Sequence, residues 1–283
     1  MILIADSGST KTEWILLNQK EVVAELYTQG INPYFQTVEQ IATVFSEELI
    51  SELPAIHIPT ISAVFYYGAG CSSTEKCAMV KQPLTQIFKN AHVEVDHDLL
   101  AAARAACGTK TGIAAILGTG SNSCLFDGKV IVANQPSLGF IMGDEGSGGH
   151  IGKELLKQYV YSELPADLYE LFIREYMLTK EIMLDHIYKK PMPNRYAASF
   201  TRFVGKHIEH PHMQQLVIDS FTEFFKRHIT SYPNYQIYSL SAVGSVASIF
   251  SEQLQAVANQ YSIRIQHIIQ KPMEGLIHYH TQS

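Results

Sequence analysis

The stretch "GIAAILGTGSNSCLFDGKVIVAN", residues 112–134, decides how this chain folds. Its apolar run ends at a turn rich in glycine and serine, and two further strand-like segments follow. The chain begins with the same order: "MILIAD" leads into the turn "SGSTKT", and the segments "EWILLN" and "EVVAELYT" come next. Aligning Gly120 with Gly8 brings the two first strands into register. The pattern indicates an internal duplication, with coincidence between two short meanders as the alternative.

Each meander is followed by alternating helical and strand patterns. After the first, we expect a helix over residues 37–53, the strand "TISAVFYYG", a helix after Ser72, the strand "HVEVDHD" and a helix over 98–107. After the second, helical patterning to about Arg227 precedes the strands "QIYSLSAVGSVAS" and "SIRIQHIIQ" and a short helix after Pro272. This predicts an α/β protein with domains at residues 1–107 and 108–271, and a last helix, 272–283, that returns to the first domain.

Composition narrows the class of protein. The 283 residues are 46% hydrophobic and 17% charged, which is typical of a soluble globular protein. The formal charge of −6 and the scattered Lys and Arg argue against nucleic acid as a partner. The start "MILIAD" lacks the basic segment of a signal peptide, no apolar run reaches membrane-spanning length, and the four cysteines are irregularly spaced. We therefore expect a cytoplasmic protein.

A glycine-rich stretch, "GFIMGDEGSGGHIGKELL" at residues 139–156, surrounds the adjacent Asp144 and Glu145. Bare backbone before a helix often binds phosphate. The Walker template nevertheless fails, because Ser147 and Glu154 occupy a required glycine and a required hydroxyl position. The dinucleotide template fails on "GTGSNS" at Ser123. A helix start with acidic capping residues is the alternative reading of this stretch.

The two strand-connecting turns suit a polyphosphate. The first carries the hydroxyls of Ser9 and Thr10, flanked by those of Ser7 and Thr12, and the cation of Lys11. Asp6, at the end of the first strand, is an oxygen ligand suited to Mg²⁺. In a duplicated protein these turns are expected on either side of a cleft that holds a nucleotide. An ordinary polar turn is the alternative for either one alone.

Four motifs in this order, "DSGSTKT", "GTGSN", "MGDEGS" and "VGSV", carry a family resemblance that covers essentially the whole chain. The chain resembles the sugar kinase, Hsp70 and actin superfamily, and within it the branch of N-acetylglucosamine kinases and BadF/BadG/BcrA/BcrD-type ATPases. The resemblance implies two duplicated ribonuclease H-like (actin-like ATPase) domains with a central nucleotide cleft. It also implies ATP and Mg²⁺ as cofactors and a small-molecule sugar as substrate. Similar proteins are commonly dimers, so a homodimer is an open expectation.

The resemblance also implies site residues. Three turns are implied to contact ATP, with Mg²⁺ on the first residue: Asp6, Gly8, Ser9, Thr10, Lys11, Thr12, Gly118, Thr119, Gly120, Gly244 and Ser245. A second set is implied to bind the sugar: Asn32, Asp98, Asn122, Ser137, Leu138, Gly139 and Asp144. Asp98 matches the general base of the family, with Asp96 as the rival and a helix-capping role as the alternative.

One departure concerns the acceptor. Similar kinases carry Gly-Trp-Gly where this chain has Ser137, Leu138 and Gly139, so the aromatic platform for a sugar is missing. The expected activity is the ATP-dependent phosphorylation of a hydroxyl of an amino sugar or N-acetylated sugar, such as N-acetylglucosamine or N-acetylmuramate. Two alternatives remain: an ATPase activator of a dehydratase or reductase, and a non-catalytic sugar sensor. The activators carry paired cysteines, and the sensors a DNA-binding extension.

Overall fold

The computed structural model describes residues 1–8 and 11–282. The chain divides into two compact units, which we call unit 1 and unit 2. Unit 1 comprises Met1–Thr109 and Pro272–Ser283, and unit 2 comprises Lys110–Lys271.

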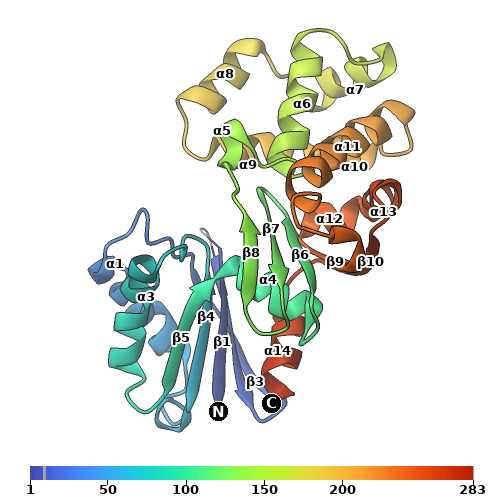
Figure 1. The fold of residues 1–283 in the computed structure, drawn as a ribbon. Helices are drawn as coiled ribbons and strands as arrows, with labels where there is room; N and C mark the ends of the chain where they lie inside the picture. Colours follow the sequence, from blue (N-terminus) through green and yellow to red (C-terminus); the bar gives the residue numbers. More distant parts are fainter. Residues whose placement is uncertain (9–10, 283) are drawn as a thin grey trace. The chain divides into compact units, whose positions relative to one another are not determined.

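Unit 1 is built on a five-stranded sheet (Figure 1). Its strands are β1 (Ile2–Ser7), β2 (Lys11–Asn18), β3 (Glu21–Gln29), β4 (Ala63–Gly68) and β5 (His92–His97). They lie in the order β3-β2-β1-β4-β5, with antiparallel pairing between β1, β2 and β3 and parallel pairing between β1, β4 and β5. The meander therefore forms one half of the sheet, and the strands that alternate with helices form the other half.

Unit 2 repeats this sheet. Its strands are β6 (Gly112–Leu117), β7 (Ser121–Phe126), β8 (Ile131–Gln135), β9 (Ser239–Val243) and β10 (Arg264–Ile269). They lie in the order β10-β9-β6-β7-β8, with β6, β7 and β8 antiparallel and β6, β9 and β10 parallel. Replacing β1–β5 by β6–β10 in turn reproduces the order of unit 1. The predicted duplication is confirmed.

Helices cover both faces of the unit 1 sheet (Figure 1). They are α1 (Val38–Val44), η1 (Phe45–Leu49), α2 (Ile50–Glu52), η2 (Ile58–Thr60), α3 (Thr74–Ile87), α4 (Asp98–Cys107) and α14 (Met273–Thr281). A capping box of Thr37 and Gln40 begins α1. Trp14 and Phe45 pack edge to face in a core that α1 and η1 help to build. On the opposite face α14 packs against α4, so the end of the chain completes unit 1.

The chain between β8 and β9 is a long helical insertion in unit 2 (Figure 1). It contains α5 (Gly139–Met142), α6 (Gly148–Val160), α7 (Ala166–Tyr176), α8 (Lys180–Tyr188), α9 (Pro193–Ser199), α10 (Thr201–Lys206), α11 (Pro211–Phe224), η3 (Phe225–Ile229) and η4 (Tyr235–Ile237). Two further helices, α12 (Ser245–Ile249) and α13 (Ser251–Gln260), lie between β9 and β10. Aromatic side chains fill the core of the insertion, where Phe172 contacts both Phe200 and Phe203.

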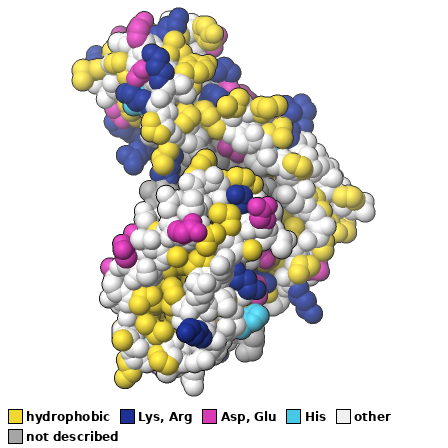
Figure 2. Space-filling view, turned by 90° about the vertical axis from the view of Figure 1, so that its left-hand side faces the viewer, with side chains coloured by type: hydrophobic (Ala, Val, Ile, Leu, Met, Phe, Trp, Pro, Cys, Tyr) yellow, Lys and Arg dark blue, Asp and Glu magenta, His cyan; other side chains and the backbone are white. Residues whose placement is uncertain are grey.

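The surface is of mixed character. The face shown in Figure 2 carries hydrophobic side chains interspersed with acidic and basic ones. None of the described helices combines the length and the apolar character that crossing a membrane requires.

Candidate active site

The first predicted phosphate turn joins β1 to β2. The amide of Gly8 donates to the carbonyl of Lys11 across 3.0 Å, and the predicted contacts Ser9 and Thr10 lie outside the described residues. Lys11, predicted as the phosphate-binding cation, places its Nζ 3.3 Å from the ring centroid of Tyr27. A cation–π contact therefore holds this ammonium group over the meander.

Buried hydroxyls support this turn. The side chains of Ser7 and Thr12 are hydrogen-bonded at 2.7 Å, and Thr12 also donates to the carbonyl of Gln29. Thr12 is fully buried. Thr12 is paired with Ser7 across the two strands, and its side chain points into the interior, where it stabilises the hairpin. The sequence had predicted an ATP contact for Thr12, and a buried side chain differs from that expectation.

Three predicted residues of unit 1 lie at one edge of its sheet. Asp6 is next to last in β1, and Asp98 directly follows β5. The strands β1, β4 and β5 are parallel, so their carboxyl ends share this edge. Asn32 is brought there by Gly70, which follows β4 and at φ +82° approaches so closely that a Cβ would overlap the amide oxygen of Asn32. The structure thus brings together the predicted metal ligand, sugar ligand and base of this unit.

Asp98 has the environment of a proton acceptor. It is the first residue of α4, and His97 is the N-cap, whose Nδ1 accepts from the amide of Leu100 at 3.3 Å. The capping role considered for Asp98 is thus filled by its neighbour. Burial raises the pKa of the Asp98 carboxyl, and the nearby His97 partly offsets this rise. The rival, Asp96, accepts a hydrogen bond from the amide of His97 instead.

A cavity of about 520 Å³ opens beside this edge. It is lined by the start of α3 and the end of β5: Cys71, Ser72, Ser73, Thr74, Cys77, Ala78, Lys81, Val95, Asp96 and His97. The lining includes the rival carboxylate Asp96 and His97, the residue that precedes Asp98.

The second phosphate turn joins β6 to β7 and is held by the start of α6. The carbonyls of Gly118 and Thr119 accept hydrogen bonds from the amides of Gly148 and Gly149, at 2.8 and 3.0 Å. On the other side Gly244, at φ +131°, approaches so closely that a Cβ would overlap the carbonyl oxygen of Leu117. The turn, the glycine stretch and the third turn predicted to contact ATP, at Gly244 and Ser245, therefore meet in unit 2.

This turn fits a phosphate chain. No heavy atom of the described residues outside the turn lies within 4 Å of the place that a Cβ of Gly118 would occupy. Thr119 is exposed, and both lie in a hairpin closed by the hydrogen bond from the Gly118 amide to Gly120. Phosphate oxygens can therefore approach the bare backbone and the threonine hydroxyl.

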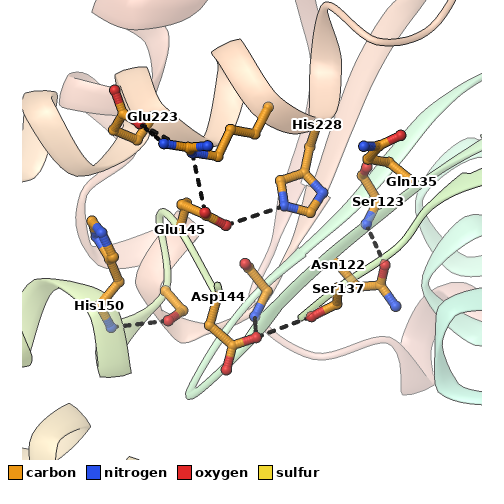
Figure 3. Close-up of polar contacts among 12 residues, drawn as sticks. Asn122, Ser123, Gln135, Ser137, Asp144, Glu145, His150, Glu223 and His228 are labelled. Carbon is orange, nitrogen blue, oxygen red and sulfur yellow. Dashed lines mark hydrogen bonds and ion pairs between the residues drawn. The ribbon is translucent and has the colours of Figure 1, made fainter. Parts of the chain in front are cut away.

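Asp144 lies against the same turn. A Cβ on Gly120 would stand 3.0 Å from Oδ2 of Asp144, and Oδ1 accepts from the Ser121 amide at 3.4 Å and the Ser137 hydroxyl at 3.1 Å (Figure 3). Only 7% of Asp144 is exposed, and burial raises its pKa, partly offset by these two donors. Its φ of +56° is uncommon outside glycine. The carboxylate is thus held firmly beside the predicted phosphate turn.

Of the other residues of unit 2 predicted to contact the sugar, Asn122 is hydrogen-bonded within the protein and Leu138 is exposed. The amide oxygen of Asn122 accepts from the backbone of Ser123 and from the side chain of Asn134. Leu138 is 62% exposed, and Gly139 begins α5 at φ +70°. An exposed leucine therefore follows Ser137 where the family has its tryptophan.

Several glycines of the 139–156 stretch serve packing of the protein on itself. A Cβ on Gly152 would overlap the carbonyl oxygen of Ala197 in α9, and one on Gly148 would stand 3.2 Å from the Cβ of Ala198. The α6 helix thus crosses α9 at backbone contact. The glycine-rich backbone of this stretch was expected to bind phosphate. At Gly148 and Gly152 the space beside the backbone is instead filled by α9.

Sequence reasoning missed the partners of Glu145. Its carboxylate contacts Nε of Arg227 at 3.2 Å and Nε2 of His228 at 3.4 Å (Figure 3). In the sequence, Glu145 stands out because it follows Asp144 directly in the glycine-rich stretch. Nothing in the sequence marked Arg227 or His228, which lie more than eighty residues later in a helical segment.

Comparisons with known proteins agree with this architecture. An N-acetylmuramic acid/N-acetylglucosamine kinase from Clostridium acetobutylicum is 26% identical over 208 residues, which cover 71% of this chain and 68% of the relative. The structure of a candidate N-acetylglucosamine kinase from Porphyromonas gingivalis is 40% identical, with a TM-score of 0.94 over 100% of this chain and 99% of that one.

A second solved structure, of a candidate N-acetylglucosamine kinase from Chromobacterium violaceum, is 15% identical with a TM-score of 0.72 over 98% of both chains, which shows a shared fold. No family model matches the chain. Identity of 40% over the whole length is decisive, and the chain belongs to the N-acetylglucosamine kinase family of the sugar kinase, Hsp70 and actin superfamily.

Proposed function

We propose that this protein is an ATP-dependent kinase that phosphorylates a hydroxyl of an amino sugar or N-acetylated sugar. The observation that supports it best is the contact between Gly120 and Asp144. It puts a carboxylate suited to sugar hydroxyls directly beside a turn suited to phosphates. A donor and an acceptor bound to these two features would lie next to each other, and phosphoryl transfer depends mostly on such positioning.

The residues take separate roles in this proposal. Asp144 and Ser137 orient the sugar by hydrogen bonds, and Asn32 and Asn122 contribute further polar contacts. The turn from Gly118 to Gly120 holds phosphate oxygens, with Gly244 and Ser245 near the rest of the nucleotide. Asp98 accepts the proton of the attacking hydroxyl, a task that its raised pKa favours.

A magnesium ion bound with ATP would neutralise charge on the transferred phosphoryl group. Among the described residues no three His, Cys, Asp or Glu side chains are grouped to hold a metal. This is compatible with Mg²⁺, which is commonly held by one or two carboxylates, by phosphate oxygens and by several waters. We assign Asp6 as the carboxylate in question, because it lies at the carboxyl edge of the unit 1 sheet.

The test is a phosphorylation screen with ATP and Mg²⁺ against N-acetylglucosamine, N-acetylmuramate, glucosamine and neutral hexoses. Sugar phosphate is measured by mass spectrometry and ADP by a coupled assay. We expect a phosphorylated amino or N-acetylated sugar in stoichiometric balance with ADP. ADP release without any sugar phosphate would instead favour an ATPase activator, and sugar binding without ADP release would favour a sensor.

A further inference from the structure

One face of the α11–η3 segment braces the glycine stretch at three points. Ser220, Phe224 and His228 are spaced four residues apart, which places them on one side of a helix. The Ser220 hydroxyl lies 2.7 Å from Nδ1 of His150. Phe224 covers Gly146, where a Cβ would stand 2.8 Å from its side chain. His228 completes the row through its contact with Glu145.

The contact at Glu145 is shielded from water. The carboxylate side chain is 13% exposed and that of His228 only 4%. Arg227 bridges Glu145 and Glu223, with contacts of 3.2 and 2.9 Å (Figure 3). Because a buried carboxylate without partners is strongly destabilised, Glu145 depends on Arg227 and His228 to remain inside.

His228 is suited to donate a hydrogen bond here. Its ring stacks on Phe224 at 4.9 Å, and burial lowers its pKa against the opposing influence of Glu145 and Asp144, with Arg227 acting in the same direction as burial. Burial thus favours the neutral ring, and a neutral ring donates to the Glu145 carboxylate when its proton is on Nε2, the nitrogen that lies 3.4 Å from that carboxylate. Within the described residues Nδ1 is buried without a hydrogen-bond partner.

The backbone is irregular at the same place. Residues Phe225–Ile229 form a π-helical turn, in which the Thr230 amide donates to the carbonyl of Phe225 at 3.0 Å. Such turns insert one residue into a helix and are frequent at functional sites. Arg227 and His228, the two consecutive residues whose side chains contact the Glu145 carboxylate, both lie in this turn.

Asp144 needs such a brace. Its left-handed backbone conformation costs free energy and persists only where the surroundings impose it. The residues on its C-terminal side, Glu145 and Gly146, are the two that η3 and α11 hold.

We propose that His228 is a positioning residue for sugar binding: it anchors Glu145 and so keeps the Asp144 carboxylate in its place beside Gly120. This inference rests on the proposed function, since it concerns the carboxylate assigned to the sugar. It adds a residue that touches neither sugar nor ATP and acts through Glu145.

The test compares His228→Leu, which removes the donor, with His228→Gln, which keeps one. The matched control is His207→Leu, because His207 also packs on an aromatic ring, that of Phe203, and has a buried ring nitrogen without a partner among the described residues. We expect His228→Leu to raise the KM for the sugar about tenfold and to leave the KM for ATP within about twofold. A tenfold effect is within the range usual for the interaction between two residues in contact. His228→Gln should recover most of the loss, and the control should leave both constants unchanged.

A double-mutant cycle with Glu145→Gln shows whether the two residues act as one unit. We expect the double variant to be about as impaired as either single variant, and independent effects that multiply to roughly a hundredfold would overturn the proposal. Equal losses for sugar and ATP in His228→Leu would do the same.

Hydrogen exchange of residues 143–147 gives a readout that needs no activity. These amides should exchange faster in His228→Leu than in the parent and in the control. If the parent phosphorylates no sugar, the proposed function fails, and the exchange rates still decide whether His228 holds the loop. Unchanged exchange in an active parent would overturn the positioning role alone.

Discussion

Asp98 unites two properties that a general base requires, a carboxylate at the carboxyl edge of a sheet and a pKa raised by burial. Replacing it by Asn keeps the shape of the side chain and removes the proton acceptor. General-base assistance is typically worth ~10²- to 10⁴-fold, so we expect Asp98→Asn to lower kcat by about this factor. ATP binding, measured by calorimetry, should be retained.

The matched control for this variant is Asp96→Asn. Asp96 lies two residues earlier in β5 and accepts a hydrogen bond from the amide of His97, a contact that the side-chain oxygen of Asn can also make. We expect near-normal turnover. If Asp96→Asn loses activity while Asp98→Asn keeps it, the base has been assigned to the wrong carboxylate.

The raised pKa of Asp98 also sets the pH dependence. A base must be deprotonated to act, and burial favours its protonated form. The acid limb of kcat/KM should therefore fall at a pH above the ordinary aspartate value of about 3.9. Rate profiles of the parent and of Asp98→Asn check this, because the residual activity of the variant should lack the same limb. An identical limb in both proteins would assign it to another group, such as Asp144.

The roles assigned to single residues remain predictions, and the structure shows where these residues lie. Asp6, Asn32 and Asp98 were assigned from motifs, and the structure gathers them at one sheet edge. Lys11 was assigned to phosphate from its place in the turn. Its contact with Tyr27 depends on the register of β2 and β3, which pairs Tyr27 with Glu13, and the expected meander did not specify this register.

At the scale of elements, α6 is defined by its close crossing with α9. We expect Gly152→Ala to lower the free energy of unfolding by ~1–3 kcal/mol, because the added methyl group overlaps the backbone of Ala197. Chemical denaturation followed by circular dichroism measures the change. The same substitution in an open helix position would be neutral or slightly favourable.

Gly205→Ala in α10 supplies that comparison. Its Cβ would lie 3.5 Å from Ile249, an ordinary contact. Equal losses of stability in Gly152→Ala and Gly205→Ala would show that the helix crossing relaxes, and that close packing is not the reason for the glycine.

The whole molecule is a duplicated fold whose last helix belongs to its first unit. In α14 the side chains of Met273 and Leu276 are buried, and His280 stacks on Phe65 and is hydrogen-bonded to Tyr67. Deleting residues 272–283 should lower the stability of unit 1 by ~3–6 kcal/mol, from the loss of two buried apolar side chains alone.

Trp14 reports this loss directly. It is the single tryptophan of the chain and lies fully buried in the core of unit 1, so its fluorescence follows the unfolding of that unit. A chain that ends at Thr281 is the control, since it keeps every contact named for α14. If the two truncated chains unfold at the same denaturant concentration as the parent, α14 contributes no stability to unit 1.

The strands, the two glycine and serine turns, their duplication and the family could all be inferred from the amino-acid sequence alone. These features depend on neighbours along the chain, because side-chain alternation and turn residues act over a few positions. The bond of Glu145 to His228, the crossing of Gly152 with Ala197 and the capping of α4 by His97 were decided only by the tertiary structure. An apolar stripe indicates that one face of a helix is buried, but it does not specify which element covers that face. Contacts between segments distant in sequence are therefore set when the helices pack.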